Sequence, residues 1–198
     1  AEFARGRRSV VLTAPCGAGK TVIFSRIAQL AAARATRTAI LVHRDSLLTQ
    51  ASAKLRDVGM KHGIIAPGHG NYGDALHVAS VQTLVRRLDR HDFDLLIVDE
   101  AHHAISPTYQ RIIGKYPKAR VLGVTATPCR ADGRGLDSIF QALVLGPNIS
   151  QLIQDGYLVE PTTYGPKHTL DLSGIKTSMG DYDQRQLAAH MDHPRITG

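Results

Sequence analysis

The chain has 198 residues, of which 43% are hydrophobic and 21% are charged, so it has enough apolar side chains for a sizeable core and is not disordered, collagen-like or of low complexity. Two cysteines, Cys16 and Cys129, are too few for a disulfide framework or a four-thiolate zinc site, and we expect a cytoplasmic protein without a membrane span. The net charge is +7, and the excess lies in residues 1–60, which hold ten Lys and Arg against three Asp and Glu. An anionic partner such as nucleic acid explains this excess, and so do solvated helix faces.

Five short apolar runs predict strands that are buried on both faces, because each run is continuously apolar rather than alternating. In chain order they are Ser9–Ala14, Thr38–His43, Leu76–Ala79, Leu95–Val98 and Val121–Val124. Apolar residues at helical spacing follow the first two runs: Ile23, Ile27 and Leu30, and then Leu47, Ala51 and Leu55. The repetition of strand, helix and strand predicts an α/β fold, with a mainly parallel sheet and helices on both faces.

Few apolar positions and several breaking residues follow Gly165, which indicates a connecting segment. A short helix is predicted for Tyr182–Met191, with Asp181 able to cap it. We therefore divide the chain into a domain of residues 1–165 and a connection of residues 166–198, and we expect both ends to continue in a longer protein.

A glycine-rich turn follows the first predicted strand and opens directly into a helix. The turn and the first helical residues are Pro15, Cys16, Gly17, Ala18, Gly19, Lys20 and Thr21. Glycines let backbone N–H groups turn inward, and the helix N-terminus adds partial positive charge, so the pattern is typical of a phosphate-binding loop. Lys20 would reach the β- and γ-phosphates of a nucleotide, and the Thr21 hydroxyl would bind magnesium. Ala14 replaces the first glycine of the generic pattern, and a glycine-rich turn without a ligand is the alternative interpretation.

Two adjacent carboxylates, Asp99 and Glu100, follow the fourth predicted strand. Ionised carboxylates are costly there unless they are solvated or bound to a cation, so Asp99 is a candidate magnesium ligand beside Thr21. Glu100 is then free to act as the general base that activates water. An exposed acidic turn is the alternative. Both clusters follow the carboxyl end of a predicted strand, which is the edge where parallel sheets bind ligands.

Five sequence motifs occur in a fixed order along residues 9–160. They are APCGAGKT at Ala14–Thr21, LVHR at Leu41–Arg44, ASVQTL at Ala79–Leu84, DEAH at Asp99–His102 and TATP at Thr125–Pro128. With them the chain resembles the first RecA-like domain of a superfamily 2 DEAD/DEAH-box helicase, in the group of restriction-enzyme and DNA-repair helicases. The resemblance implies a RecA-like P-loop NTPase domain that uses ATP and Mg²⁺, and alanine commonly opens the phosphate loop in this family.

The resemblance also implies a role for each matched residue. Lys20 and Glu100 would be catalytic, Pro15 to Thr21 would bind ATP, and Thr21 and Asp99 would hold Mg²⁺. The residues expected to contact nucleic acid are Arg44, Ser80, Gln82 and Thr83, and those expected to couple this contact to the nucleotide are His102, Thr125 and Thr127. A surface charge at a helix start is the alternative for Arg44, and a plain loop amide is the alternative for Gln82. His103 matches no motif, and we expect it to have a surface or packing role.

A second RecA-like domain of the same parent chain is the further partner that the resemblance implies. Its arginine finger would enter the nucleotide site, and such fingers contribute about 10³- to 10⁵-fold to turnover in related systems. We therefore expect this chain alone to bind ATP and to hydrolyse it slowly, while the parent protein moves on nucleic acid, with DNA favoured over RNA. A P-loop kinase of small molecules, which would leave TATP unexplained, and a nucleotide-dependent interaction module are the alternatives.

Overall fold

The computed structural model describes residues 2–69, 75–127 and 135–162, and in the C-terminal part residues 174, 175, 177, 178, 181, 182 and 184–191. The chain divides into two compact units, Ala1–Val159 and Glu160–Gly198. The first unit contains every residue of the predicted sites.

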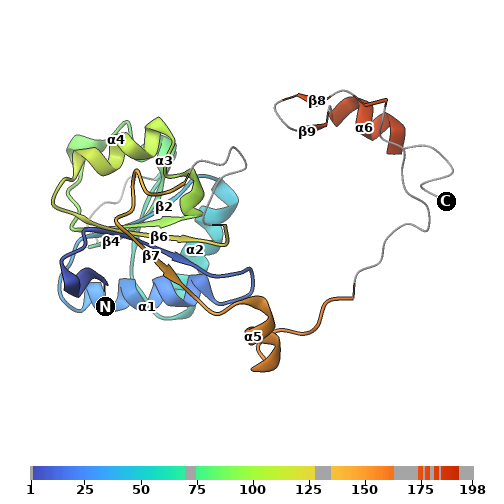
Figure 1. Ribbon diagram of the computed structural model, residues 1–198. Helices are drawn as coiled ribbons and strands as arrows, with labels where there is room; N and C mark the ends of the chain where they lie inside the picture. The colour runs from blue at the N-terminus through green and yellow to red at the C-terminus, as the bar shows by residue number, and fades with distance from the viewer. Residues whose placement is uncertain are drawn as a thin grey trace. The chain divides into compact units, whose positions relative to one another are not determined.

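Seven parallel strands form the sheet of the first unit, in the order β3-β4-β2-β5-β6-β1-β7 (Figure 1). The strands are β1 (Ser9–Thr13), β2 (Thr38–Val42), β3 (Gly63–Ile65), β4 (Leu76–Ser80), β5 (Leu95–Asp99), β6 (Arg120–Thr125) and β7 (Ala142–Leu145). The predicted α/β class and all five predicted strands are confirmed, and those five are the inner strands of the sheet. The sequence pattern misses the two edge strands, β3 and β7.

Helices cover both faces of this sheet (Figure 1). Successive strand residues point to opposite faces, so the neighbours Ile40 and Leu41 of β2 belong to two different cores. On one face Ile40 packs with residues of α1 (Lys20–Ala32) and α2 (Asp45–Asp57). On the other face Leu41 packs with residues of α3 (Val81–Leu84) and α4 (Pro107–Lys115).

The predicted apolar face of α1 is displaced by one residue from its most buried face, and of the three predicted residues only Ile23 and Ile27 are half-buried. Phe24, Ala28 and Ala31 are buried, whereas Leu30 is 49% exposed. The two alanines let the helix backbone lie close to the sheet, whereas Ile27 packs at the margin of this core and lies with Leu30 beside Phe3. In α2 the predicted face is confirmed, since Ala51 and Leu55 are buried and Leu47 is half-buried.

Shorter elements complete the first unit: the 3₁₀ helices η1 (Glu2–Arg5), η2 (Leu88–Arg90) and η3 (Ala101–His103), and helix α5 (Ile149–Gln154). Arg8, just before β1, ties the end of α4 to the sheet. Its guanidinium donates hydrogen bonds to the backbone carbonyls of Ile113 at 3.3 Å, Tyr116 at 3.0 Å and Ala119 at 2.9 Å. These carbonyls lie in or just beyond the last turn of α4, where the helix leaves such groups without intrahelical partners.

The second unit contains a two-stranded antiparallel ribbon of β8 (Thr177–Ser178) and β9 (Asp181–Tyr182), followed by α6 (Gln184–Met191). The predicted helix therefore begins two residues later than expected, and the predicted capping role of Asp181 is wrong. Pairing with β8 keeps the backbone of Asp181 and Tyr182 extended. Within the described part of the chain, no helix is long and apolar enough to cross a membrane.

Candidate functional site

The predicted phosphate-binding loop connects β1 to α1. Gly17 and Gly19 have φ angles of +81° and +75°, a left-handed conformation that glycine adopts at little cost. The amide of Ala18 donates to the carbonyl of Pro15 at 3.2 Å and closes the turn. The amides of Gly17 and Gly19 donate no hydrogen bond to any described residue. These two amides, at the N-terminus of a 13-residue helix, are available to an anion.

Lys20 extends into the same loop. Its ammonium group Nζ donates to the backbone carbonyls of Ala14 and Pro15, both at 3.0 Å. Cys16 is exposed, and its thiol is free. The seven predicted residues therefore form the connection from β1 and the first turn of α1, with the Lys20 ammonium at the carbonyls that begin the loop.

Thr21 and Asp99, the predicted magnesium ligands, line one cavity of about 320 Å³. Burial raises the pKa of Asp99, and the neighbouring Glu100 carboxylate raises it further, against the opposing effects of the Glu100 amide and Lys20. The Glu100 amide donates to Asp99 Oδ1 at 3.0 Å. A raised pKa means that the surrounding groups do not fully stabilise the negative charge of the carboxylate, so a cation would stabilise it further. Carboxylate oxygens are ligands that Mg²⁺ prefers. The residues present thus fit a magnesium ion.

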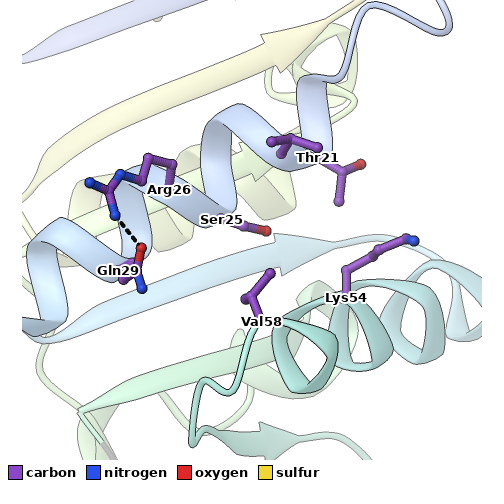
Figure 2. Close-up of a pocket in the computed structure, with 7 residues that line it drawn as sticks. Thr21, Ser25, Arg26, Gln29, Lys54 and Val58 are labelled. Carbon is purple, nitrogen blue, oxygen red and sulfur yellow. Dashed lines mark hydrogen bonds between the residues drawn. The ribbon is translucent and has the colours of Figure 1, made fainter.

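A second cavity of about 240 Å³, also lined by Thr21, lies between α1 and α2 (Figure 2). Figure 2 shows Ser25 on α1, with Lys54 and Val58 on the α2 side of this groove. The buried hydroxyl of Ser25 has no hydrogen-bond partner among the described residues. Lys54 lines both cavities beside Thr21, although no sequence motif includes it. Lys54 lies on α2, the helix beside the one that begins at the loop, and no pattern in the sequence indicated that it would be near Thr21.

Glu100 adopts a left-handed conformation, with φ of 51° and ψ of 56°. For a residue other than glycine this costs about 1–2 kcal/mol, and such strain persists only where the surrounding structure holds it. The fully buried Ala101 anchors the next position. The Glu100 side chain remains 35% exposed, and its Oε2 lies 3.4 Å from Nδ1 of His102. The turn therefore leaves one carboxylate accessible at the edge of the sheet.

The three predicted coupling residues lie together. Nδ1 of His102 is 3.1 Å from Oγ1 of Thr125, which donates to the carbonyl of Thr127 at 3.0 Å and accepts from its amide at 3.1 Å. Thr125 ends β6, the strand between β5 and β1. This topology places Thr125 between the acidic pair after β5 and the phosphate-binding loop after β1. Pro128, the last residue of TATP, lies outside the described residues.

The residues predicted to contact nucleic acid follow β2 and β4. Arg44 and Gln82 are exposed, whereas Ser80 and Thr83 are only 6% and 8% exposed. The Gln82 amide donates to the carbonyl of His43, next to Arg44, at 3.0 Å. Ser80 Oγ donates to Gln82 Oε1 at 3.0 Å. The structure thus connects the ends of the two strands and leaves two of the four side chains on the surface.

A histidine cluster, made of His43, His102 and His103, includes one of the coupling residues and the neighbour of Arg44. The ring centroid of His103 is 4.3 Å from that of His43 and 4.2 Å from that of His102. All three line a cavity of about 290 Å³ with Arg44 and Glu100. Burial lowers the pKa of His43, and the charge of Arg44 lowers it further. The packing of His103 agrees with the role expected for it, but the motifs did not indicate that the cluster bridges two sites.

Tyr109 of α4 is a further residue that the motifs missed. It is buried, and its hydroxyl has no hydrogen-bond partner among the described residues. Burial raises its pKa, and the charges of Asp99 and Glu100 raise it further, so the ring lies within the electrostatic reach of the acidic pair. A buried aromatic residue on a helix carries no sequence signal for this position.

The fold and the site together define a class of protein: the first RecA-like domain of a superfamily 2 helicase. Residues 1–130 match the family described as type III restriction enzyme, res subunit (ResIII). This match spans more than half of the chain, and the chain belongs to the ResIII family.

Two relatives support this assignment. The chain is 32% identical to a Saccharomyces cerevisiae protein provisionally named ATP-dependent helicase IRC3, over 97% of this chain and 31% of the relative. It is 33% identical to a Schizosaccharomyces pombe protein provisionally named mitochondrial ATP-dependent helicase irc3, over 93% of this chain and 33% of the relative. The chain therefore spans about a third of the length of these relatives.

Solved structures show the same fold. The UvsW helicase of bacteriophage T4 aligns with a TM-score of 0.62 at 19% identity, over 70% of this chain and 55% of that chain. The helicase domain of Pyrococcus furiosus Hef aligns with a TM-score of 0.61 at 20% identity, over 71% of this chain and 35% of that chain. At these identities the likeness concerns the fold alone.

Proposed function

We propose that the first unit binds Mg²⁺ and ATP at its phosphate-binding loop, and that it hydrolyses ATP slowly without the rest of the parent protein. The observation that carries this proposal is the shared cavity of Thr21 and Asp99, next to the loop that Lys20 enters. Thr21 and Asp99 would hold the metal ion, which neutralises phosphate charge when bound. The amides of Gly17 and Gly19 and the ammonium of Lys20 bind the phosphates.

Glu100 acts as the general base in this proposal. Its accessible carboxylate accepts a proton from the attacking water as the water oxygen bonds to the γ-phosphorus. The bond from this phosphorus to the bridging oxygen breaks, which leaves ADP and phosphate. Nδ1 of His102 lies near both the Glu100 carboxylate and the Thr125 hydroxyl, so this one ring nitrogen joins the general base to the end of β6.

The parent protein, in this proposal, uses ATP to move on nucleic acid together with a second RecA-like domain. Arg44 and Gln82 contact the phosphate backbone from the surface, while the buried Ser80 and Thr83 support this turn. The histidine cluster and the contact between His102 and Thr125 connect this surface to Glu100. We favour DNA, because the TATP loop resembles that of DNA-repair and restriction enzymes and one relative is named DNA 3'-5' translocase XPB2. The cytoplasmic location remains a prediction.

A fluorescent ATP analogue with Mg²⁺ tests the nucleotide site directly. We expect the wild-type chain to bind it, and we expect Lys20→Ala to weaken binding by about tenfold or more, since charge-assisted bonds to phosphate contribute about 1.5–3 kcal/mol. Lys118→Ala removes an exposed lysine and is the matched control. Equal binding by wild type and Lys20→Ala would refute the proposed site.

The ATPase rate of the longer parent protein, measured with and without DNA or RNA, tests the motor function. We expect stimulation by nucleic acid that weakens at high salt and disappears in Glu100→Gln. Phosphate transfer to a small molecule would instead support the kinase alternative, which leaves the contacts of Thr125 and Thr127 unexplained.

A further inference from the structure

We infer that residues 142–158, here called the strap, pack against the phosphate-binding loop and are stabilised when the loop binds a nucleotide. Leu158 is the positioning residue in this contact. This inference rests on the proposed nucleotide site. The strap consists of β7, the turn at Gly146, α5 and the residues that follow α5. It contacts the loop at two points that are twelve residues apart in the strap.

The first contact lies where β7 ends. β7 pairs with β1 in parallel register, up to Thr13 opposite Leu145. The amide of Gly146 then donates to the carbonyl of Thr13 at 2.7 Å. A Cβ atom on Gly146 would lie only 3.0 Å from Cβ of Ala14 and 3.0 Å from this carbonyl oxygen. The strap backbone is therefore pressed against the first residue of the loop.

The path of the strap to its second contact is set by hydrogen bonds. The Asn148 side chain caps α5 by accepting from the amide of Gln151 at 2.8 Å. After the helix, the amides of Tyr157 and Leu158 both donate to the carbonyl of the buried Leu152, at 2.9 and 3.0 Å. This turn reverses the chain toward the loop.

The second contact is made by the side chain of Leu158. Its Cδ2 lies 2.8 Å from the position that a Cβ atom on Gly17 would occupy. Leu158 is half-buried, although its neighbours Tyr157 and Val159 are 77% and 88% exposed. Leu158 is thus packed on Gly17, one of the two left-handed loop glycines whose amides donate no hydrogen bond to a described residue.

The packing of Leu158 restricts the loop before a nucleotide arrives. Ordering one residue costs about 1–2 kcal/mol, so a loop held in place by Leu158 binds phosphate more tightly than a free loop. Coupling between two sites is reciprocal, so a bound nucleotide must stabilise the strap by the same factor. The second unit begins at Glu160, two residues beyond Leu158. The stabilising effect of a bound nucleotide therefore extends to the residues at which the chain leaves the first unit.

Binding of a fluorescent ATP analogue with Mg²⁺ to chain variants tests this inference. We expect Leu158→Ala to weaken binding about five- to tenfold, the equivalent of ordering about one residue. Leu158→Met should retain most of the affinity, and Val159→Ala, which changes an exposed neighbour, should leave it unchanged. Circular dichroism at the assay temperature confirms that each variant is folded. Wild-type affinity or tighter binding in Leu158→Ala overturns the inference while the proposed nucleotide site stands, whereas a wild-type chain that binds no nucleotide overturns both.

Hydrogen exchange separates positioning from a purely structural role. In the wild type, we expect nucleotide to slow hydrogen exchange of the Tyr157 and Leu158 amides by about the same factor by which Leu158→Ala weakens nucleotide binding. In Leu158→Ala, we expect nucleotide to have no such effect on exchange. Amides of α4, on the opposite face of the sheet, are the internal control. Without nucleotide, Gly17→Ala should lower the melting temperature less in the Leu158→Ala background than in the wild type, because the close contact is gone. Equal effects in both backgrounds, or unchanged exchange at the strap, refute the contact.

Discussion

Asp99→Asn is expected to make the chain more stable in the absence of metal and nucleotide, while it weakens Mg²⁺-dependent nucleotide binding. Burial raises the pKa of Asp99, so its charge destabilises the fold at neutral pH. Asparagine removes the charge and keeps an oxygen that accepts the Glu100 amide. Because Asp99 is half-buried and water screens part of the charge, we expect a gain of only about 1 kcal/mol, which is about 2–4 °C in melting temperature for a chain of this size.

Thermal unfolding followed by circular dichroism in EDTA measures this gain. A folded-state pKa raised above the ordinary 3.8 means that the folded chain takes up a proton first as pH falls, so the penalty fades on acidification. The advantage of Asp99→Asn should therefore be fully present at pH 7 and shrink as the pH falls through the raised pKa of the folded chain toward 3.8. Glu160→Gln, at an exposed acidic residue, is the control and should change little. A less stable Asp99→Asn at pH 7 would show that the carboxylate is already compensated without a metal ion.

Three further changes in stability follow from the structure. Ser25→Ala should raise the free energy of unfolding by about 1 kcal/mol, because it removes a buried hydroxyl that has no partner among the described residues and because alanine favours the helix. Urea unfolding measures this change, and a loss of stability would contradict it. Arg8→Ala should lower this free energy by about 1–2 kcal/mol through its lost bonds to the end of α4, whereas the exposed Arg7→Ala should have almost no effect in the same assay. Burial lowers the pKa of His91 below its ordinary 6.5, so the unfolded chain binds a proton that the folded chain does not, and stability should fall from pH 7 to pH 5.5. This dependence should be flatter in His91→Phe, and an identical pH dependence would exclude His91 as a source.

The inner strands could be predicted because burial on both faces selects continuous apolar runs. The edge strands gave weaker signals: β3 has only three residues, and Leu143 and Leu145 of β7 are 51% and 73% exposed. The face of α1 was misassigned because the isoleucines of that helix are more hydrophobic than its alanines and therefore dominate the apolar pattern. The smaller Ala28 and Ala31 are the residues that lie against the sheet.

The parts of the site that could be predicted are contiguous in the sequence. The phosphate-binding loop and the acidic pair each carry their chemistry in a few adjacent residues, and the parallel topology brings them to one edge. The contact between Gly17 and Leu158 joins residues more than a hundred positions apart through one side chain, so no spacing could indicate it. The position of Lys54 likewise depends on how α2 packs beside α1.

The edge strand β7 has a practical consequence for work with this protein. In the described part of the chain, no strand pairs with its outer side, and Leu145 is largely exposed there. An unprotected apolar edge is a template for strand addition from another molecule. Concentrated samples should therefore self-associate by edge-to-edge pairing, and Leu145→Lys is the change that should keep them monomeric during crystallisation or spectroscopy.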